Sequence, residues 1–298
     1  MTHLESSKQK YPRGFTIIGT GRVGSALAQQ LYQKGYIIRS LFNRTRTNCE
    51  KIAGLTETRS TGIFPKSGDE LGDLVFLSLP DDQIVDYVQQ VKEKLPDPGR
   101  SAWVHTSGGT PTGILQPLAD SGAAVASFHP VQTFNGKNHE TAFERTYVTL
   151  NGNEGLCNDL KQIVRELGGR PLVVDNHQKM AIHLAAVFVC NYYAPLFAAS
   201  RQILRDNGVE VRSSDLFEPI VRQSVEGLLY NSPADVLTGP VVRGDAGTIK
   251  QHLGVLKKSP QWERIYRELG MVTLQLAREK VDRDGSGDDI LKDLLRTD

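Results

Sequence analysis

Runs of apolar, often β-branched residues alternate with amphipathic stretches along the chain as far as residue 175. These patterns, of period 2 and period 3.6, predict strands and helices in turn. The expected strands cover residues 15–18, 37–42, 74–79, 102–105, 123–128, 147–150 and 171–174. The expected helices between them cover residues 25–34, 83–95, 111–120 and 155–167. This order favours an α/β domain whose mostly parallel sheet is covered by helices on both faces.

The pattern changes after residue 175, where helical periodicity replaces the β-rich runs and predicts an all-α domain. Helices are expected at residues 177–206, 214–230, 247–256 and 261–281. The first of these is apolar nearly all round, which predicts a buried helix. The chain therefore divides into a flexible arm, an α/β domain, a helical domain and a polar tail, at residues 1–13, 14–175, 176–281 and 282–298.

The 298 residues are enough for two domains, each with its own core. Lys and Arg number 35 against 34 Asp and Glu, so the net charge of +1 gives no sign of a nucleic-acid or membrane-surface binder. The longest apolar run, residues 184–190, is far shorter than the ~18 residues of a membrane span. The polar start lacks the apolar core of a secretory signal. Three scattered cysteines argue against a disulfide framework or a zinc site and fit a reducing cytoplasm.

A glycine-rich turn, Gly19-Thr-Gly-Arg-Val-Gly24, stands between the first expected strand and the first helix. Gly19 allows the tight turn, Gly21 lets the backbone approach a pyrophosphate, and Gly24 lets the helix pack on the strand. The helix N-terminus then offers free N–H groups to the phosphates. This context favours a dinucleotide site over a glycine turn that binds nothing.

The end of the second expected strand distinguishes NADP(H) from NAD(H). An NAD site places Asp or Glu there to bind the ribose hydroxyls, whereas this chain has Asn43, Arg44 and Thr45. Arg44 can pair with a 2′-phosphate, which predicts NADP(H); the alternative is a solvated surface arginine. The residues expected to bind the cofactor are Gly19, Thr20, Gly21, Arg22, Val23, Gly24, Asn43, Arg44, Thr45, Leu79, Pro80 and Ser107.

Hydride transfer to C=O or C=N requires a nearby proton donor, and three histidines are candidates. His105 ends an expected strand, and His129 precedes Pro130, which favours an extended backbone at a strand end. His183 and Asn191 interrupt the apolar surface of the long helix and lie about 80° apart around its axis. We expect His129, His183 and Asn191 to be catalytic. The alternative for each histidine is a hydrogen-bonded structural residue.

Residues 237–248 combine three glycines with Thr238, Arg243 and Asp245 just before a helix N-terminus. Free N–H groups and an arginine suit an anionic group of a substrate, and with Gln132 these three side chains form the expected substrate site. The alternative is a capped loop at a dimer interface.

Residues 282–293 partly fit a calcium-binding loop. Asp289 occupies a position at which that loop carries an apolar residue, and there is no second copy. We therefore interpret this segment as a polar turn followed by a short terminal helix and expect no metal site.

These motifs carry a resemblance to a known family over nearly the whole chain. The chain resembles the uncharacterised proteins that join a Rossmann-like NADP-binding domain to a helical domain of unknown function. The motifs are the glycine turn, Ser127-Phe-His-Pro-Val-Gln-Thr-Phe134, His183-Leu-Ala-Ala-Val-Phe-Val-Cys-Asn191 and Leu237-Thr-Gly-Pro-Val-Val-Arg-Gly-Asp245. More distantly, the layout is similar to 6-phosphogluconate and β-hydroxyacid dehydrogenases and to pyrroline carboxylate reductases, including their all-α C-terminal domain. The resemblance implies a homodimer formed through the helical domain.

The catalytic residues of these relatives match only in part. β-Hydroxyacid dehydrogenases carry a Lys and an Asn one turn apart on the long helix, whereas here Lys179 and Asn191 are twelve residues apart. The Thr-Gly-Pro loop is similar to a loop of pyrroline carboxylate reductases, and the His-Pro pair is similar to that of prephenate dehydrogenases.

The sequence thus predicts a cytoplasmic NADP(H)-dependent oxidoreductase acting on a small carbonyl or imine compound, with a carboxylate on the substrate. The alternatives are a non-catalytic NADP(H)-binding sensor and a prephenate-type dehydrogenase. Polar side chains converging near the nicotinamide favour an enzyme, an apolar wall there favours the sensor, and a single substrate assay tests the prephenate activity.

Overall fold

The structure is a computed structural model, and it describes residues 11, 13–135, 141–280 and 288–296. These residues form two compact units, which meet along the chain between Phe188 and Val189. The division comes later than the boundary predicted at residue 175, because the helix that begins there is anchored in the first unit by Lys179. Most of the arm predicted at residues 1–13 and the calcium-like turn at 281–287 lie outside the described residues.

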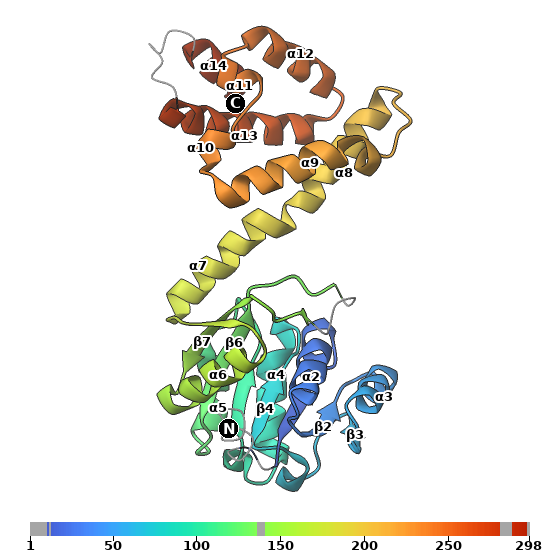
Figure 1. The fold of residues 1–298 in the computed structure, drawn as a ribbon, viewed down its shortest axis with the longest axis vertical. Helices are drawn as coiled ribbons and strands as arrows, with labels where there is room; N and C mark the ends of the chain where they lie inside the picture. The colour runs from blue at the N-terminus through green and yellow to red at the C-terminus, as the bar shows by residue number, and fades with distance from the viewer. Residues whose placement is uncertain (1–10, 12, 136–140, 281–287, 297–298) are drawn as a thin grey trace. The chain divides into compact units, whose positions relative to one another are not determined.

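The first unit contains one sheet with the strand order β3-β2-β1-β4-β5-β6-β7-β8 (Figure 1). All neighbouring strands are parallel except β6 and β7, which are antiparallel. The mostly parallel sheet predicted from the sequence is confirmed. The strands are β1 Phe15–Ile18, β2 Ile38–Phe42, β3 Ser60–Gly62, β4 Leu74–Leu77, β5 Ala102–His105, β6 Val125–Pro130, β7 Tyr147–Gly152 and β8 Arg170–Val173.

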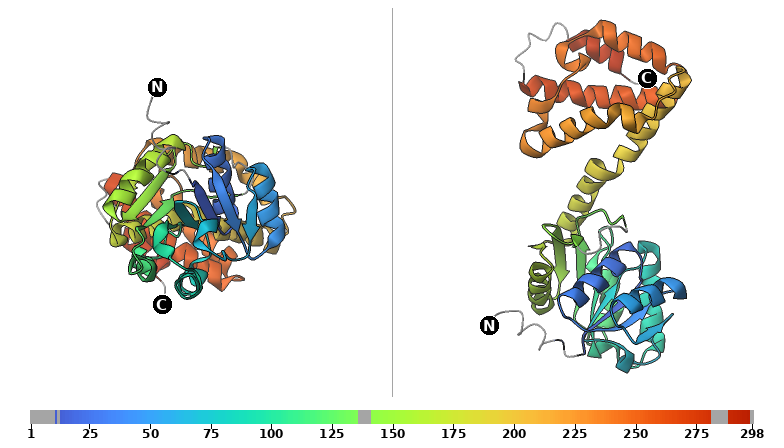
Figure 2. Two further views of the ribbon diagram at one scale, coloured as in Figure 1. Left: turned by 90° about the horizontal axis from the view of Figure 1, so that it is seen from below. Right: turned by 45° about the vertical axis from the view of Figure 1, so that its right-hand side comes forward.

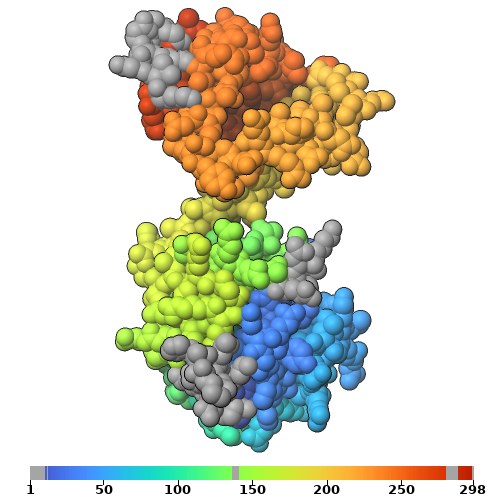
Figure 3. Space-filling model, viewed as in Figure 1, coloured from blue at the N-terminus to red at the C-terminus, as the bar shows by residue number. Residues whose placement is uncertain are grey.

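Helices cover both faces of this sheet. They are α2 Arg22–Gln33, α3 Arg46–Leu55, α4 Asp81–Lys94, α5 Gln116–Ala119 and α6 Glu154–Glu166, with short 3-10 turns at Gly68–Glu70, Pro98–Arg100 and Thr112–Leu115. Figure 3 shows blue α2 and yellow-green α6 residues forming much of the surface on the side of the first unit that faces the viewer. The sequence pattern missed α3 and β3, which carry few apolar residues.

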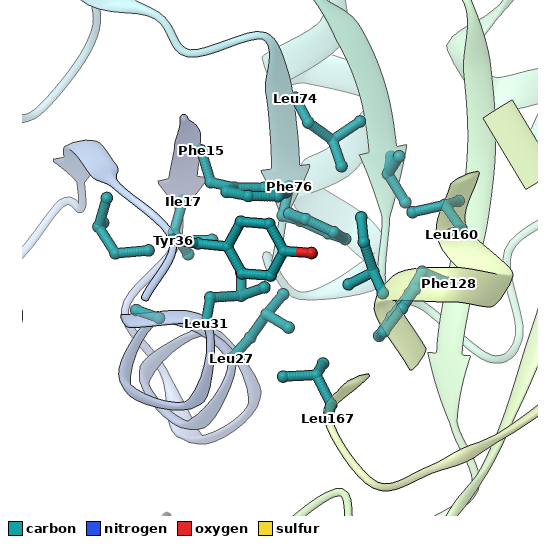
Figure 4. Close-up of a cluster of buried hydrophobic side chains, with 14 of the residues drawn as sticks. Phe15, Ile17, Leu27, Leu31, Tyr36, Leu74, Phe76, Phe128, Leu160 and Leu167 are labelled. Carbon is teal, nitrogen blue, oxygen red and sulfur yellow. The ribbon is translucent and has the colours of Figure 1, made fainter. Parts of the chain in front are cut away.

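Two apolar cores hold the helices on the sheet. On one face, Leu27 and Leu31 of α2 and Leu160 of α6 pack on β1, β4 and β6 (Figure 4). Phe15, Phe76 and Phe128 come from these three strands and stack or meet edge to face. On the other face, Ile84, Val88 and Val91 of α4 pack with Trp103 of β5. With helices on both faces of the sheet, the carboxyl ends of the strands are where a ligand of this fold usually binds.

The second unit is helical throughout its described residues (Figure 2). Its helices are α8 Tyr193–Asp206, α9 Ser213–Tyr230, α10 Pro233–Val236, α11 Pro240–Arg243, α12 Ala246–Leu256, α13 Pro260–Lys280 and α14 Asp288–Leu295. The core includes Ile249, Leu274, Leu291 and Leu295. The short terminal helix predicted within residues 282–298 is present as α14, but its apolar face packs on α13, so it belongs to the second unit rather than to a polar tail.

The long buried helix predicted at residues 177–206 differs in two ways from the structure. It consists of α7 Asn176–Ala186, a π-helical turn Val187–Asn191, and α8. Lys179 is the one residue of these three segments described as buried, so the prediction of burial is wrong for the single chain. By length and composition, Asn176–Asp206 also passes the test for a membrane span, with a mean hydropathy of 1.5. It is the one helix of this kind among the described residues, and a single such helix is weak evidence for a membrane protein.

Candidate functional site

The glycine turn has the geometry that its sequence predicts. Gly19 has φ +94°, and a Cβ there would lie 2.2 Å from the carbonyl oxygen of Ser78. A Cβ on Gly24 would lie 2.0 Å from the carbonyl oxygen of Gly19, so only glycine lets α2 approach the turn this closely. Gly21, the residue before α2, has open space around its Cβ position and no side chain that caps the helix. The first N–H groups of α2 are therefore free to face a phosphate.

Asn43 links this turn to the end of β2. Its Oδ1 accepts a hydrogen bond from the backbone N–H of Thr20 at 3.3 Å, and its Nδ2 donates to the carbonyl of Thr45 at 2.9 Å. Asn43 and Arg44 line a cavity of about 400 Å³ together with Leu79, Phe42 and Tyr87. The cavity is mainly apolar, as an adenine site is, and has a guanidinium at its rim.

Arg44 is exposed, and no ion pair is found for it among the described residues, whereas its neighbour Arg46 pairs with Glu50 at 3.4 Å. The guanidinium of Arg44 is thus available to a phosphate. Thr20 is buried, and its Oγ1 has no hydrogen-bond partner within the described part of the chain. The free helix N-terminus, the apolar cavity and the available arginine together fit a phosphorylated dinucleotide.

A second set of polar residues gathers at the ends of β5 and β6. His129 lies in β6, as predicted, and its ring meets that of His183 edge to face, with 5.6 Å between centroids. A Cβ on Gly108 would lie 2.6 Å from Nε2 of His129 and 2.6 Å from Nδ1 of His183. The structure therefore brings two of the three predicted catalytic residues together, on either side of a glycine that leaves room for both rings.

Lys179 of α7 connects this pair to the turn after β5. It is only 1% exposed, and its Nζ donates to the carbonyl oxygens of Ser107, at 3.4 Å, and of Thr110. Burial lowers the pKa of Lys179 to about 8, and the negative charge of Asp81 partly opposes this shift. The hydroxyl of Ser107 accepts from the N–H of Thr110 at 2.9 Å, so this predicted cofactor residue closes the turn.

The imidazoles of His105 and His129 are held in the neutral form, because their pKa values are lowered. Burial lowers the pKa of His129 to about 4, and His183 and Lys179 add to the effect, whereas Thr106 and Asp81 oppose it. His105 is fully buried, and desolvation, followed by Lys179 and His129, lowers its pKa to about 3. Neither ring nitrogen of His105 has a hydrogen-bond partner among the described residues. The structural alternative, a hydrogen-bonded histidine, therefore does not describe His105.

Across the described ranges, no hydrogen bond connects the remaining residues of the predicted catalytic and substrate sites to this cluster, and their roles stay predictions. Gln132 is exposed, with its Nε2 3.4 Å from Thr146 Oγ1. Asn191, Thr238, Arg243 and Asp245 belong to the second unit. Asp245 caps α12, because its carboxylate accepts from both the N–H and the hydroxyl of Thr248. This is the capped loop of the alternative interpretation, and it lowers the pKa of Asp245.

Sequence reasoning missed the importance of Lys179 and Gly108. Lys179 is four residues before His183, so the two side chains share one face of α7. The available signal was a lysine one turn before His183 at the start of the apolar stretch, because a buried lysine requires hydrogen-bond partners. Those partners are about 70 residues away along the chain, and only the fold shows them.

Two family models match the chain, one over most of the α/β unit and one over the segment that follows. Residues 3–130 match the model of the Rossmann-like domain, and residues 146–273 match that of a domain of unknown function, DUF2520. No curated protein matches the chain.

Solved structures resemble this chain over most of its length. A candidate NADP oxidoreductase from Bacteroides fragilis is 24% identical, with a TM-score of 0.74, and the match covers 88% of this chain and 97% of that one. An imine reductase from Myxococcus stipitatus in complex with NADP+ is 19% identical, with a TM-score of 0.59 and coverage of 95% and 100%. A reductive aminase from Aspergillus terreus in complex with NADPH and ethyl-5-oxohexanoate is 16% identical, with a TM-score of 0.63 and coverage of 95% and 99%. At these identities the likeness establishes the fold.

Proposed function

Because the chain belongs to the proteins that combine a Rossmann-like domain with a DUF2520 domain, we propose that it is an NADP(H)-dependent oxidoreductase. One observation carries the proposal. The ends of the strands of one sheet hold both the cavity with Arg44 and the pair His129–His183. Ligands of such sheets bind at this edge, so a cofactor along it reaches from the cavity toward the histidines. Resemblance to NADP(H)-bound imine reductases and reductive aminases supports the same class of reaction.

Each part of this edge has a role toward the cofactor. The N–H groups at the start of α2 bind the pyrophosphate, and Gly21 lets it approach. The cavity beside Leu79 takes the adenine, and Arg44 pairs with the 2′-phosphate. Bound NADPH supplies a hydride at the nicotinamide C4. The protein supplies the geometry and a proton.

The substrate we propose is a small carbonyl or imine compound that bears a carboxylate. His129 and His183 donate or hold the proton that the reduced oxygen or nitrogen requires, and Asn191 donates a hydrogen bond to the substrate. Arg243 is the proposed partner of the carboxylate. Cys49 and Cys157 form no disulfide bond, which fits the cytoplasmic location that we propose.

Oxidation of NADPH in the presence of a panel of keto acids, cyclic imines and ketone–amine mixtures tests the proposal. The readout is the loss of the absorbance of reduced nicotinamide at about 340 nm. We expect turnover with at least one member of the panel, and a fall of about 100-fold or more in kcat for His129→Ala or His183→Ala. Unchanged turnover in both variants would show that neither histidine is catalytic. Tight NADPH binding without turnover on any compound would favour a sensor.

Arg44→Ala should weaken NADPH binding by at least about 10-fold and change NADH binding by less than about 3-fold, because only NADPH carries the 2′-phosphate. Arg46→Ala is the matched control. Arg46 is two residues away, but it is committed to Glu50, so its loss should leave both affinities unchanged. Isothermal titration of each variant measures both constants. An equal loss for NADH and NADPH would remove Arg44 from the 2′-phosphate site.

We also propose that the protein is a homodimer formed through the helical domain. Leu229 and Tyr230, the last two residues of α9, are 72% and 80% exposed, which is unusual for large apolar side chains at consecutive positions. Covering them with a second copy removes this apolar surface from water. A dimer explains the exposed apolar side chains without a membrane. The helix α7 is a poor candidate for a membrane span, because Lys179 binds it to the turn after β5.

Sedimentation should give twice the chain mass of 32.9 kDa. Replacing both Leu229 and Tyr230 by glutamate should shift the protein to the monomer, because two charges would then be buried at the interface. Leu55→Glu, at a 52% exposed position of α3, is the control and should remain dimeric. A wild-type monomer at micromolar concentration would contradict the proposal.

A further inference from the structure

The side chain of Lys179 holds the turn that follows β5. Its Nζ contacts the carbonyl oxygens of Ser107 and Thr110, and the Ser107 hydroxyl and Thr110 N–H close the turn from within. A buried ammonium requires such acceptors, because burial without hydrogen bonds costs several kcal/mol. The lysine and the turn therefore hold each other in place. Neither can move without leaving polar groups unsatisfied.

The same turn fixes the orientation of His129. Nδ1 of His129 lies 3.2 Å from the carbonyl oxygen of Thr106, the residue before the turn. A carbonyl oxygen only accepts, so Nδ1 must carry the hydrogen. Because burial keeps the ring neutral, Nε2 then carries none and can only accept a hydrogen bond. The tautomer of His129 thus follows from the position of one backbone carbonyl.

The bare Nε2 of His129 is on the side of His183. Nε2 of His129 and Nδ1 of His183 are each 2.6 Å from the position that a Cβ on Gly108 would take. The two nitrogens are therefore separated by no more than twice that distance. At such a separation, a hydrogen on Nδ1 of His183 can reach Nε2 of His129 through one bridging oxygen. This arrangement resembles the pairing of a catalytic acid with an orienting acceptor.

We propose that Lys179 is a positioning residue, which holds the turn so that His129 stays the acceptor of the pair and His183 is the residue that exchanges the proton with the substrate. This inference rests on the proposed function and deepens it. In the reduction, the substrate carbon gains a hydride from NADPH, and its oxygen or nitrogen gains a proton from Nε2 of the imidazolium form of His183, whose Nδ1–H remains directed at His129. The products are NADP+, the alcohol or amine, and the neutral imidazole of His183. His129 gives up no proton in this step.

The tautomer of His129 is measurable without cofactor or substrate. In ¹⁵N-labelled full-length protein, two-bond ¹⁵N–¹H correlation spectra distinguish a protonated Nδ1 from a protonated Nε2, and the spectrum of His129→Asn assigns the signal. We expect wild-type His129 to carry its hydrogen on Nδ1 over the neutral pH range. A hydrogen on Nε2 would overturn the proposal. This measurement stands even if every Lys179 variant fails to fold.

Lys179→Met tests the positioning role. We expect a mixture of both tautomers, because the turn loosens. We also expect the pKa of His129 to move up from about 4, because a positive charge that lowers it is lost. The groups that face His129 and must be followed with it are His183 and Lys179 on α7, Asp81 on α4 and His105 on β5. Lys179→Arg keeps a cation that can donate to both carbonyls and should preserve the Nδ1–H tautomer.

Lys161→Met is the matched control, since Lys161 lies on the surface helix α6, where its Nζ donates to Asn158. It should leave the His129 signals unchanged. Identical His129 tautomer and pKa in wild type and Lys179→Met would overturn the positioning role. Failure of the proposed function is a separate result: NADPH would not bind, whereas the tautomer of His129 would be as expected.

Discussion

Replacing Gly24 by alanine should lower the free energy of unfolding of the first unit by about 3 kcal/mol, because the new methyl group has no room. Its Cβ would lie 2.0 Å from the carbonyl oxygen of Gly19 and 3.1 Å from Cβ of Ser78, so α2 must move away from the sheet. The same movement displaces the helix N-terminus that faces the pyrophosphate. Urea unfolding followed by the fluorescence of Trp103, which is fully buried in this unit, measures the loss.

Gly21→Ala is the control that separates folding from cofactor binding. Nothing lies within 4 Å of the Cβ position of Gly21, and its φ of −73° is open to alanine. We expect the stability to change by less than about 1 kcal/mol and the affinity for NADPH to fall by at least about 10-fold, since the methyl group occupies the path of the pyrophosphate. A Gly24→Ala protein as stable as the wild type would contradict the packing of α2 described here.

The protein should lose stability steeply as the pH falls from about 6.5 to about 4.5, by about 2.7 kcal/mol per pH unit from two histidines alone. The folded-state pKa values of His105 and His129 are lowered to about 3 and about 4. In the unfolded chain both groups titrate near 6.5, so over this range the unfolded state binds up to two more protons than the folded state. Their contribution is therefore constant above about pH 6.5 and is lost as the pH falls.

His105→Gln isolates one half of this effect. The variant should show a slope smaller by about 1.4 kcal/mol per pH unit between pH 6 and 4.5, whatever its stability at pH 7. His177→Gln removes an exposed histidine and should retain the wild-type slope. Urea unfolding at closely spaced pH values gives both curves. Equal slopes in wild type and His105→Gln would show that His105 titrates normally in the folded protein.

The sheet could be predicted from the sequence because its strands are buried. β4 is apolar at every position and β1 at every position except Thr16, and both strands are fully buried, so local composition reveals them. The segment Arg46–Leu55 forms α3 although only Cys49, Ile52 and Ala53 are buried, and β3 is Ser-Thr-Gly at the edge of the sheet. Elements that bury so little surface leave only a weak periodic pattern, and tertiary contacts decide whether they form.

Apolar composition also misled the prediction for residues 177–206. The pattern shows that a helix avoids water, but it does not show what covers the helix. In the single chain, Leu184 and Val189 are 53% and 71% exposed. The sequence pattern of a helix buried in its own domain is the same as that of a helix covered by a second copy.

The candidate site, like the fold, could be predicted from the sequence only in part. The glycine turn and Arg44 could be predicted, because the turn requires glycine at fixed spacing and Asn-Arg-Thr follows β2 directly. The contact between His129 and His183 joins a strand to a helix more than 50 residues later, and the role of Lys179 depends on two carbonyl groups. No local pattern encodes such contacts. The histidines were found because of their chemistry, whereas Lys179 required the fold.

Titration calorimetry of the wild-type protein with NADPH and with NADH tests the central claim most directly. The account predicts saturable binding of one NADPH per chain and an affinity for NADH at least about 10-fold weaker, since Arg44 meets a 2′-phosphate in only one of the two. Equal affinities would contradict the assignment of NADP(H). The absence of binding for both nucleotides would contradict the account as a whole.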